Sequence, residues 1–198
     1  PAIESPFHYA LDENFEYNAA GWNVGIDLNR YAELLFQMPA PPSRGFLKAW
    51  DPVAQREVWS VEHPGAFNGG ILSTAGNLVF QGSSDGRFVA YTADTGEKVW
   101  ELPVNIGIVA PPISYELSGE QYIAVLAGWG GNVIVGMDAG VSAASHYENL
   151  GRLLVFKLDG SGAVPAVPTK AAPFLLPAPR LEYTEIELKG QAVYYQGG

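Results

Sequence analysis

Cysteine is absent from this chain of 198 residues. Disulfides, thiolate metal sites and haem attachment through a CxxCH sequence are therefore excluded within it. Histidine is scarce as well, because the chain has only His8, His63 and His146, and none of them stands at a spacing typical of paired metal ligands. A metal site built on sulfur or imidazole is therefore not expected.

Basic residues are also few, with 11 Lys and Arg against 21 Asp and Glu and a formal net charge of −10. No cluster of Lys or Arg interrupts this acidic balance, so the composition disfavours nucleic acid as a partner. Two interpretations remain open. The charge is either an ordinary acidic surface or a docking face for a basic electron carrier.

Long hydrophobic runs are missing too. The longest charge-free apolar stretch, residues 121–137, contains four Gly and one Asn, and it is too short to span a bilayer. The opening Pro-Ala-Ile-Glu does not resemble a secretory leader and suggests the interior of a longer chain. We expect a soluble protein, or a soluble piece of one, with no membrane span.

Glycine and proline are abundant, with 23 and 15 copies, as in turn-rich globular proteins. The pattern Ala-x-Asp-x-x-Thr-Gly-x-x-x-Trp occurs nearly intact at residues 90–100 as AYTADTGEKVW. It occurs less completely at residues 49–59 as AWDPVAQREVW. The two copies are offset by 41 residues. A period of this size predicts stacked, four-stranded blades. In such blades Gly96 takes a positive φ, and Trp59 and Trp100 are expected to lie between neighbouring blades rather than against a ligand.

Turn residues divide the rest of the chain into short strands. One complete antiparallel blade is expected from four strands, at residues 71–74, 78–81, 88–92 and 98–102. The end of a preceding blade is expected at residues 46–50 and 56–61, and most of a following blade at residues 108–117, 121–127 and 153–158.

The remaining segments are expected to lie outside the blades. Residues 1–43 should form an ordered excursion held by buried aromatic side chains, with little helix before residue 160. Five prolines within residues 164–179 predict an extended linker. A propeller closes only with about four or more blades, so we expect the chain to be the C-terminal part of a larger propeller and incomplete on its own.

Two stretches carry a resemblance to a known family: HPGAFNGGILSTAGNLVFQGSSDGRFVAYTADTGEKVWELP at residues 63–103 and QYIAVLAGWGGN at residues 121–132. They resemble the C-terminal blades of alcohol dehydrogenases that depend on pyrroloquinoline quinone (PQQ), of the soluble quinohaemoprotein type. The match covers residues 45–160 with high specificity and residues 1–43 more loosely. It implies an all-β, eight-bladed propeller of W-shaped sheets in residues 1–160, and a linker in residues 161–198 that leads toward a cytochrome c domain.

The resemblance also implies the chemistry. Such enzymes are periplasmic and oxidise a small alcohol to an aldehyde by hydride transfer to PQQ, with Ca²⁺ polarising the quinone and an aspartate taking the alcohol proton. The electrons then pass to haem c or another acceptor. In this family the Ca²⁺ ligands, the aspartate, a vicinal disulfide and a stacking Trp come from earlier blades. No catalytic or metal-ligating residue is therefore expected in this chain.

The resemblance carries two groups of cofactor-binding candidates onto this sequence. Asn68 precedes a Gly-Gly pair, and the second group comprises Trp129, Gly130, Gly131, Asn132 and Val133. Glycine lets the backbone approach a flat, anionic ring, and Asn or backbone N–H groups can bond its carboxylates and carbonyls. The alternative is that both groups are tight turns near the propeller axis.

Two rival functions stay open at this point. The first is a non-enzymatic propeller of the same repeat family, such as a scaffold for outer-membrane assembly, and the second is a sensor or carbohydrate-binding propeller. The Gly-Trp-Gly-Gly sequence and the proline-rich segment argue against a scaffold, because a scaffold needs no slot for a flat ligand.

Overall fold

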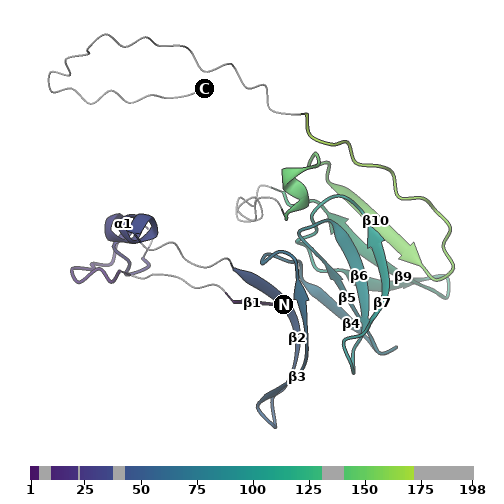
Figure 1. Ribbon diagram of the computed structural model, residues 1–198. Coiled ribbons are helices and arrows are strands. Elements are labelled where there is room, and N and C mark those ends of the chain that lie inside the picture. The colour runs from purple at the N-terminus through teal and green to yellow at the C-terminus, as the bar shows by residue number, and fades with distance from the viewer. Residues whose placement is uncertain (5–9, 22, 38–42, 131–140, 172–198) are drawn as a thin grey trace.

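The computed structural model describes residues 1–4, 10–21, 23–37, 43–130 and 141–171 (Figure 1). In this part of the chain the strands form three antiparallel sheets, whose strand orders are β1-β2-β3, β4-β5-β6-β7 and β10-β9-β8. The sheets follow one another along the chain, and they do not close into a ring. The prediction of an all-β propeller segment with antiparallel blades is confirmed.

The second sheet is the complete blade, with strands at Ile71–Thr74 (β4), Leu78–Gly82 (β5), Arg87–Thr92 (β6) and Lys98–Pro103 (β7). Each strand pairs with the next, as the turn signals predicted. Its three turns contain Asn77 (φ 61°), Gly86 (φ 87°) and Gly96 (φ 73°). Residues that tolerate positive φ therefore stand where the chain reverses.

The first sheet contains β1 (Ala2–Glu4), β2 (Arg44–Asp51) and β3 (Arg56–His63). The register shifts between Ala49 and Trp50 in this sheet and between Ala90 and Tyr91 in the second, at the same position of the repeat. Gln55 has φ 51°, and it occupies the position that Gly96 fills in the second copy. The backbone conformation is therefore the same in both copies, even where the first copy lacks residues of the pattern.

The third sheet contains β8 (Ile113–Leu117), β9 (Glu120–Ala127) and β10 (Arg152–Lys157). The prediction that its first strand begins at Ile108 is wrong by five residues. Ile108 instead forms an isolated parallel bridge with Gly128. Pro111 and Pro112 follow it, and proline has no N–H to donate to a ladder, so the strand begins only after them.

Apolar side chains fill the space between consecutive sheets. Leu47, Val79, Val89 and Tyr91 pack between the first and second sheets, together with Trp59. A larger cluster joins the second and third sheets, and its buried members are Phe88, Val104, Ile106, Ile108, Val125, Ala127, Leu154 and Val167. These two clusters hold the three sheets against each other, as expected for neighbouring blades.

The segment between β1 and β2 contains a helix of ten residues, α1 (Leu28–Gln37), which agrees with the expectation of little helix before residue 160. Asp27 begins this helix, because its carboxylate accepts hydrogen bonds from the backbone N–H groups of Asn29 and Arg30. The segment departs from the prediction in its aromatic residues. Its aromatic side chains are not all buried, since Phe15 is 45% and Tyr17 is 76% exposed. No sheet of the described chain covers either side chain.

Residues 161–171 run back over the third sheet without forming a strand. A single bridge joins Tyr147 to Thr169, and Arg152 Nη1 donates to the carbonyl of Pro165 at 2.5 Å. A short 3-10 helix, η1 (Ala143–Ser145), lies beside this segment. The boundary predicted at residue 160 and the linker role of residues 161–198 stay predictions. In the described residues, no helix is both long and apolar enough to cross a membrane.

Candidate functional site

Asn68 lies in the connection from β3 to β4. Its side-chain Nδ2 donates to the carbonyl of Gly65 at 2.7 Å, and its Oδ1 accepts from the backbone N–H of Ser84 at 3.2 Å. The side chain therefore ties its own connection to the turn between β5 and β6. An amide group has two N–H bonds and two lone pairs on oxygen, and the described residues use one N–H and one lone pair of Asn68.

The two glycines after Asn68 are surrounded by protein backbone. A Cβ atom at Gly69 would lie 2.8 Å from the carbonyl oxygen of Ile108, and one at Gly70 would lie 2.7 Å from Cβ of Pro111. Both glycines are therefore small because the segment that enters the third sheet passes close to them. This contact accounts for the Gly-Gly pair without a ligand.

A buried polar pair lies behind this connection and joins the first two sheets. Gln81 Nε2 donates to the carbonyl of Gly69 at 2.9 Å, which turns its Oε1 toward His63 Nε2, also at 2.9 Å. His63 Nε2 must therefore carry the proton that this second bond needs. Burial lowers the pKa of the His63 imidazole, and the hydrogen bond to Gln81 opposes that effect. No local pattern in the sequence indicates this pair.

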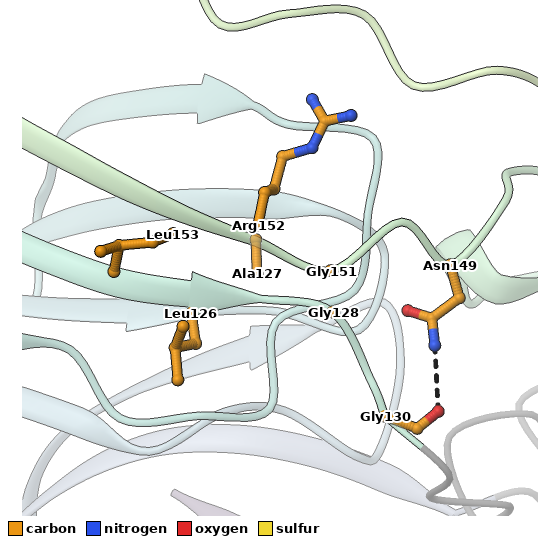
Figure 2. A pocket seen from close by; sticks show the side chains of 8 residues that line it. All are labelled: Leu126, Ala127, Gly128, Gly130, Asn149, Gly151, Arg152 and Leu153. Carbon is orange, nitrogen blue, oxygen red and sulfur yellow. Dashed lines mark hydrogen bonds between the residues drawn. The ribbon is translucent and has the colours of Figure 1, made fainter.

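Trp129 stands where β9 ends, in a turn with two glycines at positive φ. Gly128 has φ 137° and Gly130 has φ 57°. The Gly128 N–H donates to the carbonyl of Gly107, and the Trp129 N–H donates to Asn149 Oδ1 at 3.2 Å. Asn149 Nδ2 in turn donates to the carbonyl of Gly130 at 2.9 Å (Figure 2). One side chain thus contacts two consecutive residues of the turn.

An open hollow of about 560 Å³ lies beside this turn. It is bounded by residues of β9, of the turn and of the start of β10, namely Leu126, Ala127, Gly128, Gly130, Asn149, Gly151, Arg152 and Leu153. Leu126 is 60% and Leu153 is 61% exposed, so the floor of the hollow is apolar while its far end carries the amide of Asn149 (Figure 2).

Asn68 and Trp129, predicted separately, are connected through Ser84 and Gly107. Asn68 bonds to Ser84, and a Cβ atom at Gly107 would lie 3.2 Å from the Ser84 carbonyl oxygen and 3.7 Å from Trp129 Cδ1. Ser84 is fully buried, and its hydroxyl has no hydrogen-bond partner in the described structure. The structure thus brings two of the predicted residues together at one end of the sheets. Gly131, Asn132 and Val133 lie outside the described residues.

One cation lies near this end of the sheets and was missed by sequence reasoning. The ammonium group of Lys170 donates to the carbonyl of Ala144 at 2.6 Å and lies 6.0 Å from the centre of the Trp129 ring. That distance is the outer limit of a cation–π contact. No local pattern marks Lys170, because its position depends on how residues 161–171 fold back. The described residues contain no group of three or more His, Asp or Glu that could hold a metal ion.

Comparisons with known proteins identify the family of the chain. A PQQ family model, described as the β-propeller domain of glucose, ethanol and alcohol dehydrogenases, matches residues 21–123. The chain is 38% identical over 196 residues to the quinohemoprotein alcohol dehydrogenase of Comamonas testosteroni, with 94% of this chain and 26% of that protein covered. It is also 38% identical over 178 residues to the 1-butanol dehydrogenase (cytochrome c) of Thauera butanivorans, with 84% and 24% covered.

A solved structure is similar as well. The crystal structure of the quinohemoprotein alcohol dehydrogenase from Comamonas testosteroni matches with a TM-score of 0.60 and 39% identity, over 78% of this chain and 23% of that one. The chain spans about a quarter of the length of the curated relatives it matches. Since the family model covers more than half of the chain and the described sheets are propeller blades, the chain belongs to the β-propeller family of PQQ-dependent glucose, ethanol and alcohol dehydrogenases.

Proposed function

We propose that this chain is part of a PQQ- and Ca²⁺-dependent alcohol dehydrogenase that oxidises a small alcohol to an aldehyde, and that it supplies one wall of the cofactor site. PQQ, when bound, supplies the quinone that accepts the hydride. The observation that carries the proposal is the convergence of Asn68 and Trp129 on Ser84 and Gly107. Two segments that the family resemblance assigned to cofactor binding, about 60 residues apart, meet at one end of the sheets.

The groups at this end suit a flat anion. Among the described residues, one side-chain N–H of Asn68 and the buried Ser84 hydroxyl have no partner, and the Lys170 ammonium lies near Trp129. Donors and a cation favour carboxylates, and an aromatic face favours a planar ring. Asn68 and Trp129 would contact the cofactor, and we propose that Gly130, Gly131, Asn132 and Val133 extend the same wall.

The partners follow from the same proposal. The face of the third sheet turned away from the second exposes apolar side chains at Ile113, Leu126, Leu153 and Val155, as a blade does where it meets its neighbour. The remainder of the propeller would cover this face and supply the Ca²⁺ ligands and the catalytic aspartate. The names of the relatives support haem c or another cytochrome as electron acceptor. A periplasmic location goes with that assignment.

The test is titration of PQQ into the metal-loaded apo form of the complete protein that contains this chain, followed by the absorbance of the bound quinone. Uptake of PQQ with restored alcohol oxidation supports the proposal. A protein that takes up no PQQ and shows no quinone band refutes it, and favours a scaffold or a sensor propeller instead.

Two variants examine the wall itself. Gly131→Val should weaken PQQ binding far more than it lowers thermal stability, because a branched side chain would occupy the space left for a planar ligand. Asn68→Ala should weaken binding less, by about 0.5–1.5 kcal/mol, the net worth of one neutral hydrogen bond. Unchanged affinity in both variants would remove this chain from the cofactor site, and equal losses of affinity and stability in Gly131→Val would indicate a plain turn.

A further inference from the structure

We infer that Asn149 is a positioning residue of the cofactor wall, which fixes the conformation of residues 128–130 through its side-chain amide. The inference rests on the proposed function. Asn149 would not touch the cofactor. It would act through the turn, whose central residue is Trp129.

The geometry gives Asn149 two opposite roles at once. Its Oδ1 accepts from the Trp129 N–H at 3.2 Å, and its Nδ2 donates to the Gly130 carbonyl at 2.9 Å. The amide therefore forms the two hydrogen bonds that the backbone of a neighbouring strand would form. It does so beyond the end of β9, where no strand is paired with the turn. Figure 2 shows the amide directed at the Gly130 carbonyl.

The turn needs such a contact because its own residues do not determine its shape. Gly128 and Gly130 have φ of 137° and 57°, and glycine takes positive and negative φ about equally well. Without an outside contact the turn would sample several conformations, and the Trp129 ring would move with it. The absence of a side chain at Gly128 also leaves room for the chain that leads into β10, since a Cβ there would lie 3.2 Å from Gly151 Cα.

Asn149 is itself held from both sides. The backbone N–H of its neighbour Glu148 donates to the carbonyl of Pro168, and Tyr147 forms a bridge with Thr169. On the other side, Asn149 is three residues from the start of β10 at Arg152. The amide therefore projects from a segment that cannot easily follow the turn if the turn moves.

The experiment uses the complete protein with Asn149→Asp and Asn149→Ala. Aspartate has the same shape and keeps the acceptor for the Trp129 N–H, but it loses the donor to Gly130. Alanine loses both bonds. We expect the dissociation constant of PQQ, titrated into the apo form, to rise about tenfold for each variant, in line with the loss of one or two hydrogen bonds. Hydrogen exchange of the peptide that contains Trp129 should accelerate in Asn149→Ala.

A matched control exists elsewhere in the chain. Asn23 has the same arrangement, since its Oδ1 accepts from the Asn18 N–H and its Nδ2 donates to the carbonyls of Asn18 and Gly21. This contact lies in the segment between β1 and β2. Asn23→Asp should therefore leave the affinity for PQQ unchanged.

Each outcome is decisive. A wild-type protein that binds no PQQ overturns the proposed function and this inference with it. Wild-type binding with unchanged affinity in both Asn149 variants overturns the inference alone, whether or not hydrogen exchange accelerates. An equal loss of affinity in Asn23→Asp also overturns it, because the effect would then reflect general destabilisation. Weaker binding in the Asn149 variants alone supports it.

Discussion

Replacing Gly96 with alanine should destabilise the contact between the first two blades. Gly96 has φ 73°, and a Cβ atom there would lie 2.6 Å from Cε3 and 2.7 Å from Cδ2 of the Trp59 ring. The Trp59 indole lies on this glycine and donates its N–H to the carbonyl of Ala93 at 3.0 Å. The glycine of one repeat and the tryptophan of the preceding repeat therefore form a single contact.

Three terms determine the expected loss of stability. A non-glycine residue in the left-handed region costs about 1–2 kcal/mol. The lower entropy of alanine in the unfolded chain offsets about 0.4–1 kcal/mol of that cost. Overpacking against the ring adds about 1–3 kcal/mol, since the ring must move away from its acceptor at Ala93. Gly96→Ala should therefore lower the free energy of unfolding by about 2–4 kcal/mol.

The assay is denaturant unfolding of the complete protein, with Gly96→Ala made alone and together with Trp59→Leu. Once the ring is gone, only the backbone strain remains, so the cost of Gly96→Ala should fall to about 1 kcal/mol. Gln55 is the matched position, because it stands where the first repeat lacks the glycine and has φ 51°. Gln55→Gly should stabilise the protein by about 0.5–1 kcal/mol.

Two results would refute this reasoning. The first is an equal cost of Gly96→Ala with and without the Trp59 ring, which would mean that the ring does not cause the loss. The second is a loss from Gln55→Gly, which would mean that the left-handed backbone at this repeat position is not strained.

Two further predictions concern the same blades. Trp100→Ala should lower the free energy of unfolding by roughly 3 kcal/mol, which is at the low end for a large aromatic side chain. The ring packs edge-on against Phe88 and Phe156, but it is 39% exposed. A shift below about 1 kcal/mol in denaturant unfolding would contradict its role between blades. Burial lowers the pKa of His63 in the folded state. As the pH drops below about 6.5, the imidazole of the unfolded state is therefore protonated before that of the folded state. The free energy of unfolding should fall until the pH reaches the lowered folded pKa. Unfolding measured against pH in wild type and His63→Asn checks this, because the variant should lose that part of the slope.

The blades could be predicted because their signals are local. The chain reverses at residues whose own backbone preferences favour a turn, namely Asn77, Gly86 and Gly96. These turns limit the length of each strand, so the bounds of the strands follow from the sequence. The late start of β8 was also readable, from Pro111 and Pro112. So was α1, where Asp27 precedes apolar residues at helical spacing, namely Leu28, Tyr31, Ala32, Leu35 and Phe36. The richness of this segment in aromatic residues favours burial, but it does not indicate which elements would cover the aromatic side chains.

The contacts around the candidate site could not be predicted in the same way. Asn149 is 20 residues from Trp129 in sequence, and Lys170 reaches the same ring only because residues 161–171 fold back over the third sheet. Nothing in the residue types near either position specifies that fold. Such contacts depend on tertiary placement, which a single sequence does not encode in any local pattern.

Glycine shows why residue type alone does not identify a ligand wall. Gly70 and Gly130 were both assigned to the approach of a cofactor, yet their surroundings differ. A Cβ at Gly70 would meet Pro111 at 2.7 Å, whereas a Cβ at Gly130 would meet no described atom within 4 Å. Protein already fills the space at Gly70, so its small size serves the packing of neighbouring blades. At Gly130 the described protein leaves the space open, and glycine is required by φ 57° instead. Of the two, Gly130 is the position at which the described residues leave the space beside the backbone open.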